Sequence, residues 1–401
     1  MKLKLNIKRI LINTNVIGIL MTLLLSSFDE QYKTFQIGTM LILISAVLNL
    51  FINKKRHKFY DGYFFLMIFF MTLGSIIFLI YLFSNSFFSF PNYTFGVDMM
   101  KSTVRAKIAL ALVLLNAYSF STRLDNKEKH YYLDRFYILS SIIVVIIFFT
   151  NFENLLDIWE TPKRLNGFST RPTQLASVLS VTFFLGFDTY NRRRIKKRYF
   201  YFFLIITIIV SILTESEALL LSIVISLIIL ALYRITIYFI KRNKKVAHKF
   251  IASIIFYGLL ITPIVLFFLI RVFDADRDQA SGRFNIWWNS IRATSYSPIF
   301  GFGPGSYSGT KGVPFIGKEA HNTILDLLGY GGVFLLFLIT YIYYKIINKL
   351  TVNNFLVLAL VSITVYGMFH NNGRTPYYWL LLFFLLDVKK QEIKKINNVW
   401  N

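Results

Sequence analysis

Apolar stretches of about 20 residues recur along the whole chain, and charged residues are nearly absent from them. A helix of about 20 residues crosses a hydrocarbon core of roughly 30 Å. Inside such a core the backbone can satisfy its hydrogen bonds only as a helix or a closed barrel. Because the stretches are continuously apolar and do not alternate with polar residues, we predict an all-α, polytopic membrane protein, a transmembrane helical bundle.

The sequence predicts a single integral membrane domain over residues 1–401, with about twelve spans. Their approximate ranges are 10–28, 35–52, 63–83, 107–120, 135–152, 172–190, 199–213, 218–240, 250–270, 321–344, 355–369 and 377–388. The first span follows Lys2, Lys4, Lys8 and Arg9, as in a secretory signal, but no small-x-small cleavage site follows it. We therefore expect this span to be retained as an anchor.

The distribution of charge predicts the orientation of the spans. Only 16% of the residues are charged, and the net charge is +24. Most Lys and Arg residues fall in alternate connecting segments, namely 1–9, 53–62, 121–135, 191–198, 241–249, 345–354 and 389–401. The positive-inside rule places these segments and both termini in the cytoplasm. The basic excess thus reflects topology and contact with anionic lipid headgroups, and we expect no nucleic-acid partner.

Two arginines lie in a loop that this topology places on the outer side. Arg164 and Arg171 flank a Gly-Ser-Thr turn just before the span that begins at Pro172. Guanidinium groups and backbone N–H groups at a helix start both suit phosphate oxygens. The alternative is that they are ordinary surface arginines in an exposed loop. We predict that one of the two binds an anionic substrate.

A large extracytoplasmic loop is predicted over residues 271–320. It opens with Asp274, Asp276 and Asp278, a spacing that could suggest a divalent metal. No glutamate completes a calcium-binding loop, however, and the twelve-residue pattern is absent. The chain also has no cysteine, which excludes disulfides and thiolate metal sites. A solvated segment beside the membrane is the favoured interpretation, and we expect no metal.

The middle of this loop predicts an amphipathic helix lying on the membrane surface. Phe284, Trp287, Trp288 and Ile291 recur at helical spacing, and tryptophan favours the membrane interface. Arg283 falls in the first turn, where the helix dipole disfavours a cation. A bound anion would offset that cost, so Arg283 is a candidate ligand of an anionic substrate. The alternative is an interfacial arginine that contacts headgroup phosphates.

The end of the loop adds glycines and a histidine. Gly301, Gly303 and Gly305 alternate with other residues, a pattern that allows tight turns or close approach to a ligand. His321 lies at the mouth of the following span with Glu319 two residues before it, and together they could take a proton from a sugar hydroxyl. A helix-capping or headgroup-contacting histidine is the alternative.

Further polar residues are predicted at the same outer face. Asp326 lies one to two turns inside the span, where a carboxylate is costly unless paired or wet. The last outer loop, residues 370–376, contains His370 and Arg374. Glu215 and Glu217 provide two more carboxylates. These residues favour an outward-facing site for an anionic amphiphile that carries hydroxyl groups, and they leave catalysis and transport open.

Residues 281–333 resemble the O-antigen ligase and polysaccharide polymerase superfamily of bacterial envelopes. The resemblance is carried by Gly282-Arg283 with Trp287, by Pro298 with Gly301-x-Gly303-x-Gly305, and by Ala320-His321-Asn322 followed by Gly331-Gly332. The late outer loop and the number of spans also match that family, and the Arg164–Pro172 loop is similar to its earlier arginine-bearing loop. Ser216-Glu217 stands where the family often has Ser-Arg, and Tyr330 stands where it often has Glu.

The resemblance implies a GT-C-like membrane glycosyltransferase that uses undecaprenyl-pyrophosphate-linked oligosaccharide without metal or cofactor. It implies that Arg283, with Arg164 or Arg171, holds the donor pyrophosphate and that His321 deprotonates or orients the acceptor hydroxyl. We further expect Glu319 to assist His321. Arg374, Asn322, Gly303 and Gly305 are expected to bind the glycan or the pyrophosphate.

Two activities exist within that family. A polymerase joins lipid-linked repeat units to one another, and a ligase transfers a finished glycan to another acceptor. The richness in Lys, Ile, Asn and Phe suggests an A/T-rich genome and favours a capsule or exopolysaccharide polymerase in the cytoplasmic membrane of a bacterium. Other polysaccharide assembly or export proteins are candidate partners. A flippase is disfavoured because the ionisable residues cluster at one face and no repeat is visible. A non-catalytic scaffold is also disfavoured, because it would not need ionisable residues gathered at one face of the membrane.

Overall fold

The computed structural model describes residues 2–29, 33–52, 61–83, 97–151, 164–169, 171–239, 278–305, 319–349 and 355–387. These residues form helices and connecting loops, with no strand among them. The helices are α1 (Lys2–Leu24), the short 3-10 helix η1 (Ser26–Phe28), α3 (Thr34–Ile52), α4 (Asp61–Phe83), α5 (Val97–Arg123), α6 (Asn126–Thr150), α8 (Pro172–Asn191), α9 (Lys197–Leu213), α10 (Glu217–Phe239), α12 (Asp278–Thr294), α13 (Thr323–Lys349), α14 (Phe355–Gly367) and α15 (Pro376–Asp387). The predicted all-α fold is confirmed.

The predicted span 250–270 lies outside the described residues, and each of the other predicted spans falls largely on a helix of the structure. Six of the described helices are long and apolar enough to cross a membrane; they lie within α1, α3, α4, α5, α6 and α13. Shorter apolar helices occur in α10, α14 and α15. The chain is thus a multi-pass membrane protein, while the number of twelve spans and the orientation of the termini stay predictions.

Hydrogen bonds between loops define one end of the bundle, which we call the His321 end. The Ser27 N–H, after α1, donates to the Phe168 carbonyl, and the Leu165 N–H donates to the Leu213 carbonyl at the end of α9. The loop 164–169 therefore joins the end of α1 to the end of α9. α8, α10, α13 and α15 begin at this end.

The opposite end, which we call the Arg192 end, is also held by polar contacts. Lys8 of α1 donates to the Glu128 carboxylate of α6 at 2.6 Å. Arg192, just after α8, pairs with Asp134 of α6 at 2.7 Å and with Asp188 at 2.6 Å. α1 and α6 therefore run from the Arg192 end, and α8 runs from the His321 end to the Arg192 end.

A buried polar network joins four helices. Asn15 of α1 donates to Ser45 of α3 at 2.8 Å and to the Asn116 carbonyl oxygen of α5 at 2.7 Å. The Tyr132 hydroxyl of α6 donates to Asn15 Oδ1 at 2.6 Å. A polar side chain between membrane helices stabilises their packing when it is hydrogen-bonded. α1 and α3 also approach closely through Gly18 and Gly38, where an added Cβ on either residue would lie 2.8 Å from the carbonyl of the other.

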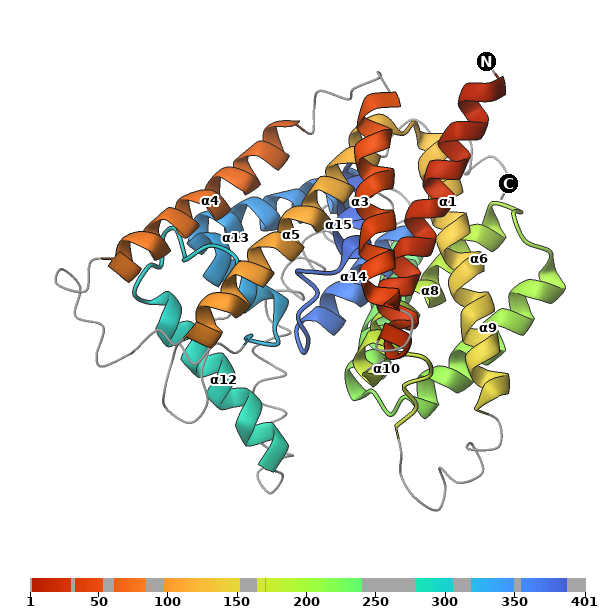
Figure 1. Ribbon diagram of the computed structural model, residues 1–401. Helices are drawn as coiled ribbons and strands as arrows, with labels where there is room; N and C mark the ends of the chain where they lie inside the picture. Colours follow the sequence, from red (N-terminus) through yellow and green to blue (C-terminus); the bar gives the residue numbers. More distant parts are fainter. Residues whose placement is uncertain are drawn as a thin grey trace.

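The loop after α12 packs into a kink in α13. Gly331 and Gly332 depart from helical geometry, and the Val333 N–H donates to the Pro298 carbonyl at 2.9 Å. The Phe302 N–H donates to the Gly329 carbonyl at 2.7 Å. The kink leaves backbone N–H and carbonyl groups of α13 without partners in the helix, and the loop forms hydrogen bonds with them. The loop and α13 therefore stabilise each other's conformation. In Figure 1, α4, α5 and α13 lie together at one side of the molecule, with α12 below them.

Candidate active site

The start of α13 carries the histidine that the sequence singles out. Asn322 caps the helix, because its side-chain oxygen accepts from the N–H groups of Ile324 at 3.0 Å and Leu325 at 3.2 Å. His321, one residue before, has a φ of 51°, a left-handed conformation that costs energy for a residue with a Cβ. Such strain is often concentrated at functional sites. Asn322, predicted to bind substrate, thus has a local role in holding the turn that presents His321.

An ion pair joins the residue before this turn to the last predicted outer loop. Arg374 Nη1 pairs with Glu319 Oε1, and the Asn371 amide donates to Glu319 Oε2 at 3.2 Å. The same amide lies 3.4 Å from the Tyr330 hydroxyl. The structure therefore brings together two of the predicted site residues, Glu319 and Arg374, and it adds Tyr330 and Asn371 to them.

Asp326 completes this cluster from within α13. It is 5% exposed, its Oδ1 accepts the Ala320 N–H at 3.3 Å, and its Oδ2 has no hydrogen-bonding partner among the described residues. Burial alone lowers the pKa of Arg374, but Tyr330, Glu319 and Asp326 raise it above its ordinary value. Arg374 therefore keeps its charge, and its buried Nε and Nη2 find no partner within the described part of the chain.

A chain of contacts connects His321 with the predicted arginine loop. Thr323 donates to the His370 carbonyl at 3.0 Å, and the His370 ring packs on the Tyr366 ring with centroids 4.6 Å apart. The Tyr366 hydroxyl donates to the Thr173 carbonyl in the first turn of α8 at 2.7 Å. The start of α8, which follows Arg171, is therefore tied to the start of α13 through the end of α14.

The two arginines of that loop differ in what they contact. Arg164 donates from Nε to the Thr214 carbonyl at 3.2 Å and from Nη2 to the Glu215 carbonyl at 3.0 Å, in the turn between α9 and α10. Arg171 precedes the first residue of α8 and is exposed, and its guanidinium has no partner among the described residues. Arg164 thus holds a turn, whereas Arg171 is available to a ligand.

The predicted helix is present as α12, although its two tryptophans do not share one face. Trp287 is 9% exposed and packs near Phe369, with ring centroids 6.4 Å apart, whereas Trp288 is 61% exposed. Adjacent residues on a helix point about 100° apart, so one tryptophan joins the protein and the other faces outward. Arg283 lies in α12, but its side chain is outside the described part, as are Asp274 and Asp276.

The predicted glycines serve the packing of the loop. Gly301 and Gly303 have φ values of 64° and 75°, and Gly305 is buried. A Cβ at Gly303 would overlap Ser75 of α4 and lie 2.8 Å from Lys107 Nζ of α5. Sequence reasoning missed Lys107, because a lysine at the first residue of a predicted span is ordinarily interfacial.

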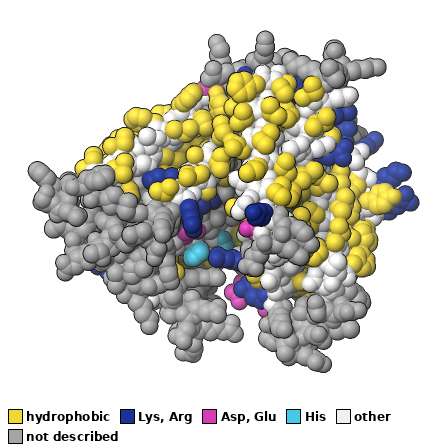
Figure 2. All heavy atoms as spheres, viewed as in Figure 1, with side chains coloured by type: hydrophobic (Ala, Val, Ile, Leu, Met, Phe, Trp, Pro, Cys, Tyr) yellow, Lys and Arg dark blue, Asp and Glu magenta, His cyan; other side chains and the backbone are white. Residues whose placement is uncertain are grey.

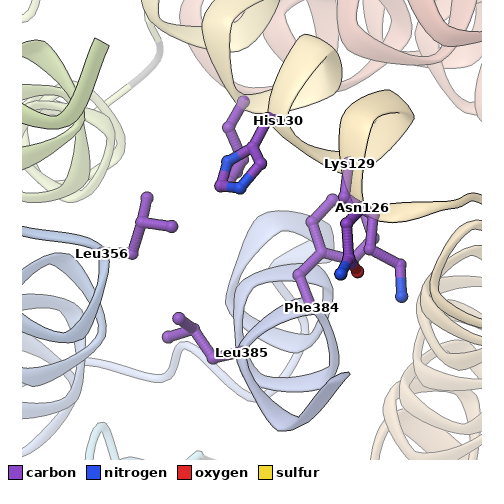
Figure 3. Close-up of a pocket in the computed structure, with 7 residues that line it drawn as sticks. Asn126, Lys129, His130, Leu356, Phe384 and Leu385 are labelled. Atoms are coloured by element: carbon purple, nitrogen blue, oxygen red, sulfur yellow. The ribbon is translucent and has the colours of Figure 1, made fainter. Parts of the chain in front are cut away.

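Charged and histidine side chains gather in a recess of the otherwise largely hydrophobic face in Figure 2. A separate small cavity lies elsewhere and has room for about one water molecule. Figure 3 shows His130, Lys129 and Asn126 of α6 at this cavity, with Leu356 of α14 and Phe384 and Leu385 of α15. It adjoins the start of α14, whereas His370 follows its end, and the 13 residues of α14 span about 20 Å. The cavity is thus distinct from the His321 cluster.

No group of three His, Asp or Glu side chains within the described ranges could hold a metal ion. The candidate site among the described residues consists of His321, the Glu319–Arg374 pair, Asp326 and Arg171 at the start of α8.

Comparison with known proteins tests the family resemblance that the sequence predicts. Residues 169–340 match the family model described as O-antigen ligase. The predicted resemblance to the O-antigen ligase superfamily is confirmed over these residues. Among curated proteins, the ComP-specific O-oligosaccharyltransferase of Acinetobacter baylyi is 24% identical to this chain, in an alignment that covers 96% of this chain and 67% of the relative. No solved structure matches the chain.

The O-antigen ligase match covers part of the candidate site. It contains Arg171, Arg283 and His321, together with Glu319 and Asp326. Arg164 and Arg374 lie outside the matched residues on either side. The ion pair of Glu319 with Arg374 therefore joins the matched region to the helices that follow it.

Proposed function

We propose that this chain is a membrane glycosyltransferase that joins lipid-pyrophosphate-linked oligosaccharide repeat units on the outer face of the cytoplasmic membrane. The observation that carries the proposal is the strained His321 beside the Glu319–Arg374 pair, at the same end of the bundle as the exposed Arg171. A proton acceptor and an anion-binding group are the two parts that sugar transfer from a pyrophosphate requires. The match of residues 169–340 to the O-antigen ligase family supports glycan transfer.

The donor pyrophosphate is assigned to Arg171 and Arg283. Arg171 stands at the start of α8, where its guanidinium and the first backbone N–H groups of the helix suit phosphate oxygens. Arg283 is assigned to the same task through the family resemblance and its place in α12. Arg164 is assigned a structural role, because its guanidinium already donates to two backbone carbonyls.

The acceptor hydroxyl is assigned to His321. The hydroxyl oxygen attacks the anomeric carbon of the donor sugar, and the bond from that carbon to the pyrophosphate oxygen breaks. The proton of the hydroxyl moves to the His321 imidazole, and the electron pair leaves with the lipid pyrophosphate. Arginines stabilise the charge that develops on the leaving group. The Glu319–Arg374 pair fixes the segment that precedes His321.

A second candidate is an O-antigen-type ligase that moves a finished glycan to a different acceptor. The description of the matched family and the name of the relative, an O-oligosaccharyltransferase, favour it. Both candidates use the same donor chemistry and differ in the acceptor alone. The experiment below separates them by the length and the attachment of the glycan.

The test replaces His321 by Ala in the native cell and sizes the envelope polysaccharide on a gel. We expect long chains to disappear while single lipid-linked repeats accumulate on the outer leaflet. His130→Ala, at the cavity near the start of α14, is the matched control and should leave chain length unchanged. Long chains that persist on the carrier lipid would indicate the ligase. Normal polymer in His321→Ala with protein in the membrane would contradict the site, and repeats trapped on the inner leaflet would indicate a flippase.

A further inference from the structure

Lys107 is a cation inside a membrane-spanning segment that the mechanism above does not use. Lys107 lies near the start of the candidate membrane span Thr103–Arg123 of α5, just before the continuous apolar run that begins at Ile108. An ionisable residue at such a position is costly and generally marks a functional contact. Lys107 is half-buried, whereas Val104, Arg105 and Ile108 on the same helix are exposed. Its side chain therefore turns toward the protein and away from the lipid.

The ammonium of Lys107 has only neutral neighbours in the described part of the chain. It donates to the Ser75 hydroxyl of α4 at 2.8 Å and lies 5.6 Å from the centroid of the Phe78 ring. No carboxylate of a described residue pairs with it, whereas Arg192 pairs with two carboxylates and Arg374 with one. Its positive charge thus has no compensating carboxylate among the described residues, and a cation in such surroundings suits an anionic ligand.

The backbone around Lys107 is shaped by glycine. Gly303 has a φ of 75°, and because it has no Cβ its backbone packs directly against Ser75 and the Lys107 ammonium. Gly74 is equally close, since an added Cβ would lie 2.6 Å from the Gly303 nitrogen. Glycines at close approaches allow a ligand or another backbone to come near. Lys107, Ser75 and Gly303 thus form a small polar cradle at the junction of α4, α5 and the 298–305 loop.

This cradle is separate from the position of Arg171. α5 packs on α3 and α15, whereas α8 packs on α6, α9 and α14. Beside the cradle, α4 and α5 present apolar side chains outward, including Ile76, Ile80, Val104 and Ile108. A lipid chain could lie along this surface with its phosphate at the depth of Lys107, because acyl and polyprenyl chains favour apolar protein faces.

We propose that Lys107, the Ser75 hydroxyl and the backbone of Gly303 form a second lipid-phosphate subsite, which holds the pyrophosphate of a second lipid-linked chain. This inference rests on the proposed function, because joining two lipid-linked repeats requires two such positions, one for the donor and one for the acceptor. Arg171 then binds the pyrophosphate of one lipid-linked chain, and Lys107 binds that of the other. The phosphate of an ordinary phospholipid has the same chemistry and is the competing occupant.

The test counts bound lipids by native mass spectrometry of the full chain in neutral phosphatidylcholine nanodiscs. Undecaprenyl pyrophosphate and phosphatidylglycerol are added in separate series. We expect the unaltered protein to bind two undecaprenyl pyrophosphates and Lys107→Gln to bind one. Lys107→Arg should still bind two, because it keeps the charge. The matched control is Arg105→Gln, an exposed cation two residues away on the same helix, which should also bind two.

Three results would overturn the subsite. They are two lipids retained by Lys107→Gln, a single lipid on the unaltered protein, or phosphatidylglycerol taken up equally well in a Lys107-dependent way. Thermal unfolding of each variant checks that a loss of lipid does not come from a loss of fold. The number of bound lipids does not depend on catalysis. If His321→Ala remained active, the proposed function would be contradicted, but the lipid count of Lys107→Gln would still test the subsite.

Discussion

The guanidinium of Arg374 forms an ion pair with the carboxylate of Glu319, which lies 55 residues earlier in the chain. This contact joins the segment before α13 to the loop between α14 and α15. Asp326 and Tyr330 lie close enough to influence the charge of Arg374. A single cation thus balances a cluster that holds two carboxyl groups beside the strained His321.

Replacing Arg374 by Gln should therefore reduce both activity and stability. Glu319 would lose its ion pair and Asp326 its nearby cation, and the loss of a hydrogen bond to a charged group costs about 1.5–3 kcal/mol. Thermal unfolding in detergent would measure the change for Arg374→Gln, Glu319→Gln and the double variant. The two effects should be less than additive, because either change breaks the same pair. Fully additive effects would contradict a direct interaction.

The two arginines of the 164–171 loop should respond differently to substitution. Arg171→Gln should weaken binding of undecaprenyl pyrophosphate with little effect on unfolding temperature, because its guanidinium has no partner among the described residues. Arg164→Gln should instead lower the unfolding temperature, since it removes hydrogen bonds to the Thr214 and Glu215 carbonyls. Binding measured in nanodiscs, beside thermal unfolding of the same samples, would separate the roles. The reverse pattern would assign the donor to Arg164.

The sequence predicts the helices well because hydrocarbon imposes a length and a polarity on each span. It does not predict which charged side chains pair across the bundle. Nothing local in Glu319 or Arg374 indicates their contact, since it depends on how α13, α14 and α15 pack. For the same reason Lys107 resembles an interfacial lysine until α4 and Gly303 are placed beside it.

Trp287 and Trp288 show a second limit of sequence reasoning. Their apolar character predicts a helix with one membrane-facing stripe, yet Trp287 packs against the protein and Trp288 points outward. Hydrophobicity indicates that a side chain avoids water but does not distinguish lipid from protein as its surroundings. In a membrane protein the two surroundings are similarly apolar, so periodicity alone cannot assign a face.

Glycine substitutions test the junction between the 298–305 loop and α13. Gly332→Ala should be strongly destabilising, because Gly332 has a φ of 63° and an added Cβ would overlap the Ile299 backbone. Strained backbone of this kind costs about 1–3 kcal/mol before any clash is counted. The matched control is Gly62→Ala in α4, where a Cβ would meet nothing within 4 Å. Equal unfolding temperatures for the two variants would contradict the packing described for the kink.

The ion-pair cluster at the Arg192 end should matter for stability and leave substrate binding intact. Arg192 pairs with Asp134 and Asp188, and these carboxylates raise its pKa although burial alone lowers it. Arg192→Met would leave both carboxylates without their cation, and breaking a buried pair in this way costs about 3–5 kcal/mol. Thermal unfolding should therefore show a large decrease for Arg192→Met and little change for Arg194→Met, an exposed neighbour. If the folded fraction of Arg192→Met bound less undecaprenyl pyrophosphate per molecule, the two ends of the bundle would be coupled, and the separation of structural and substrate-binding roles proposed here would be wrong.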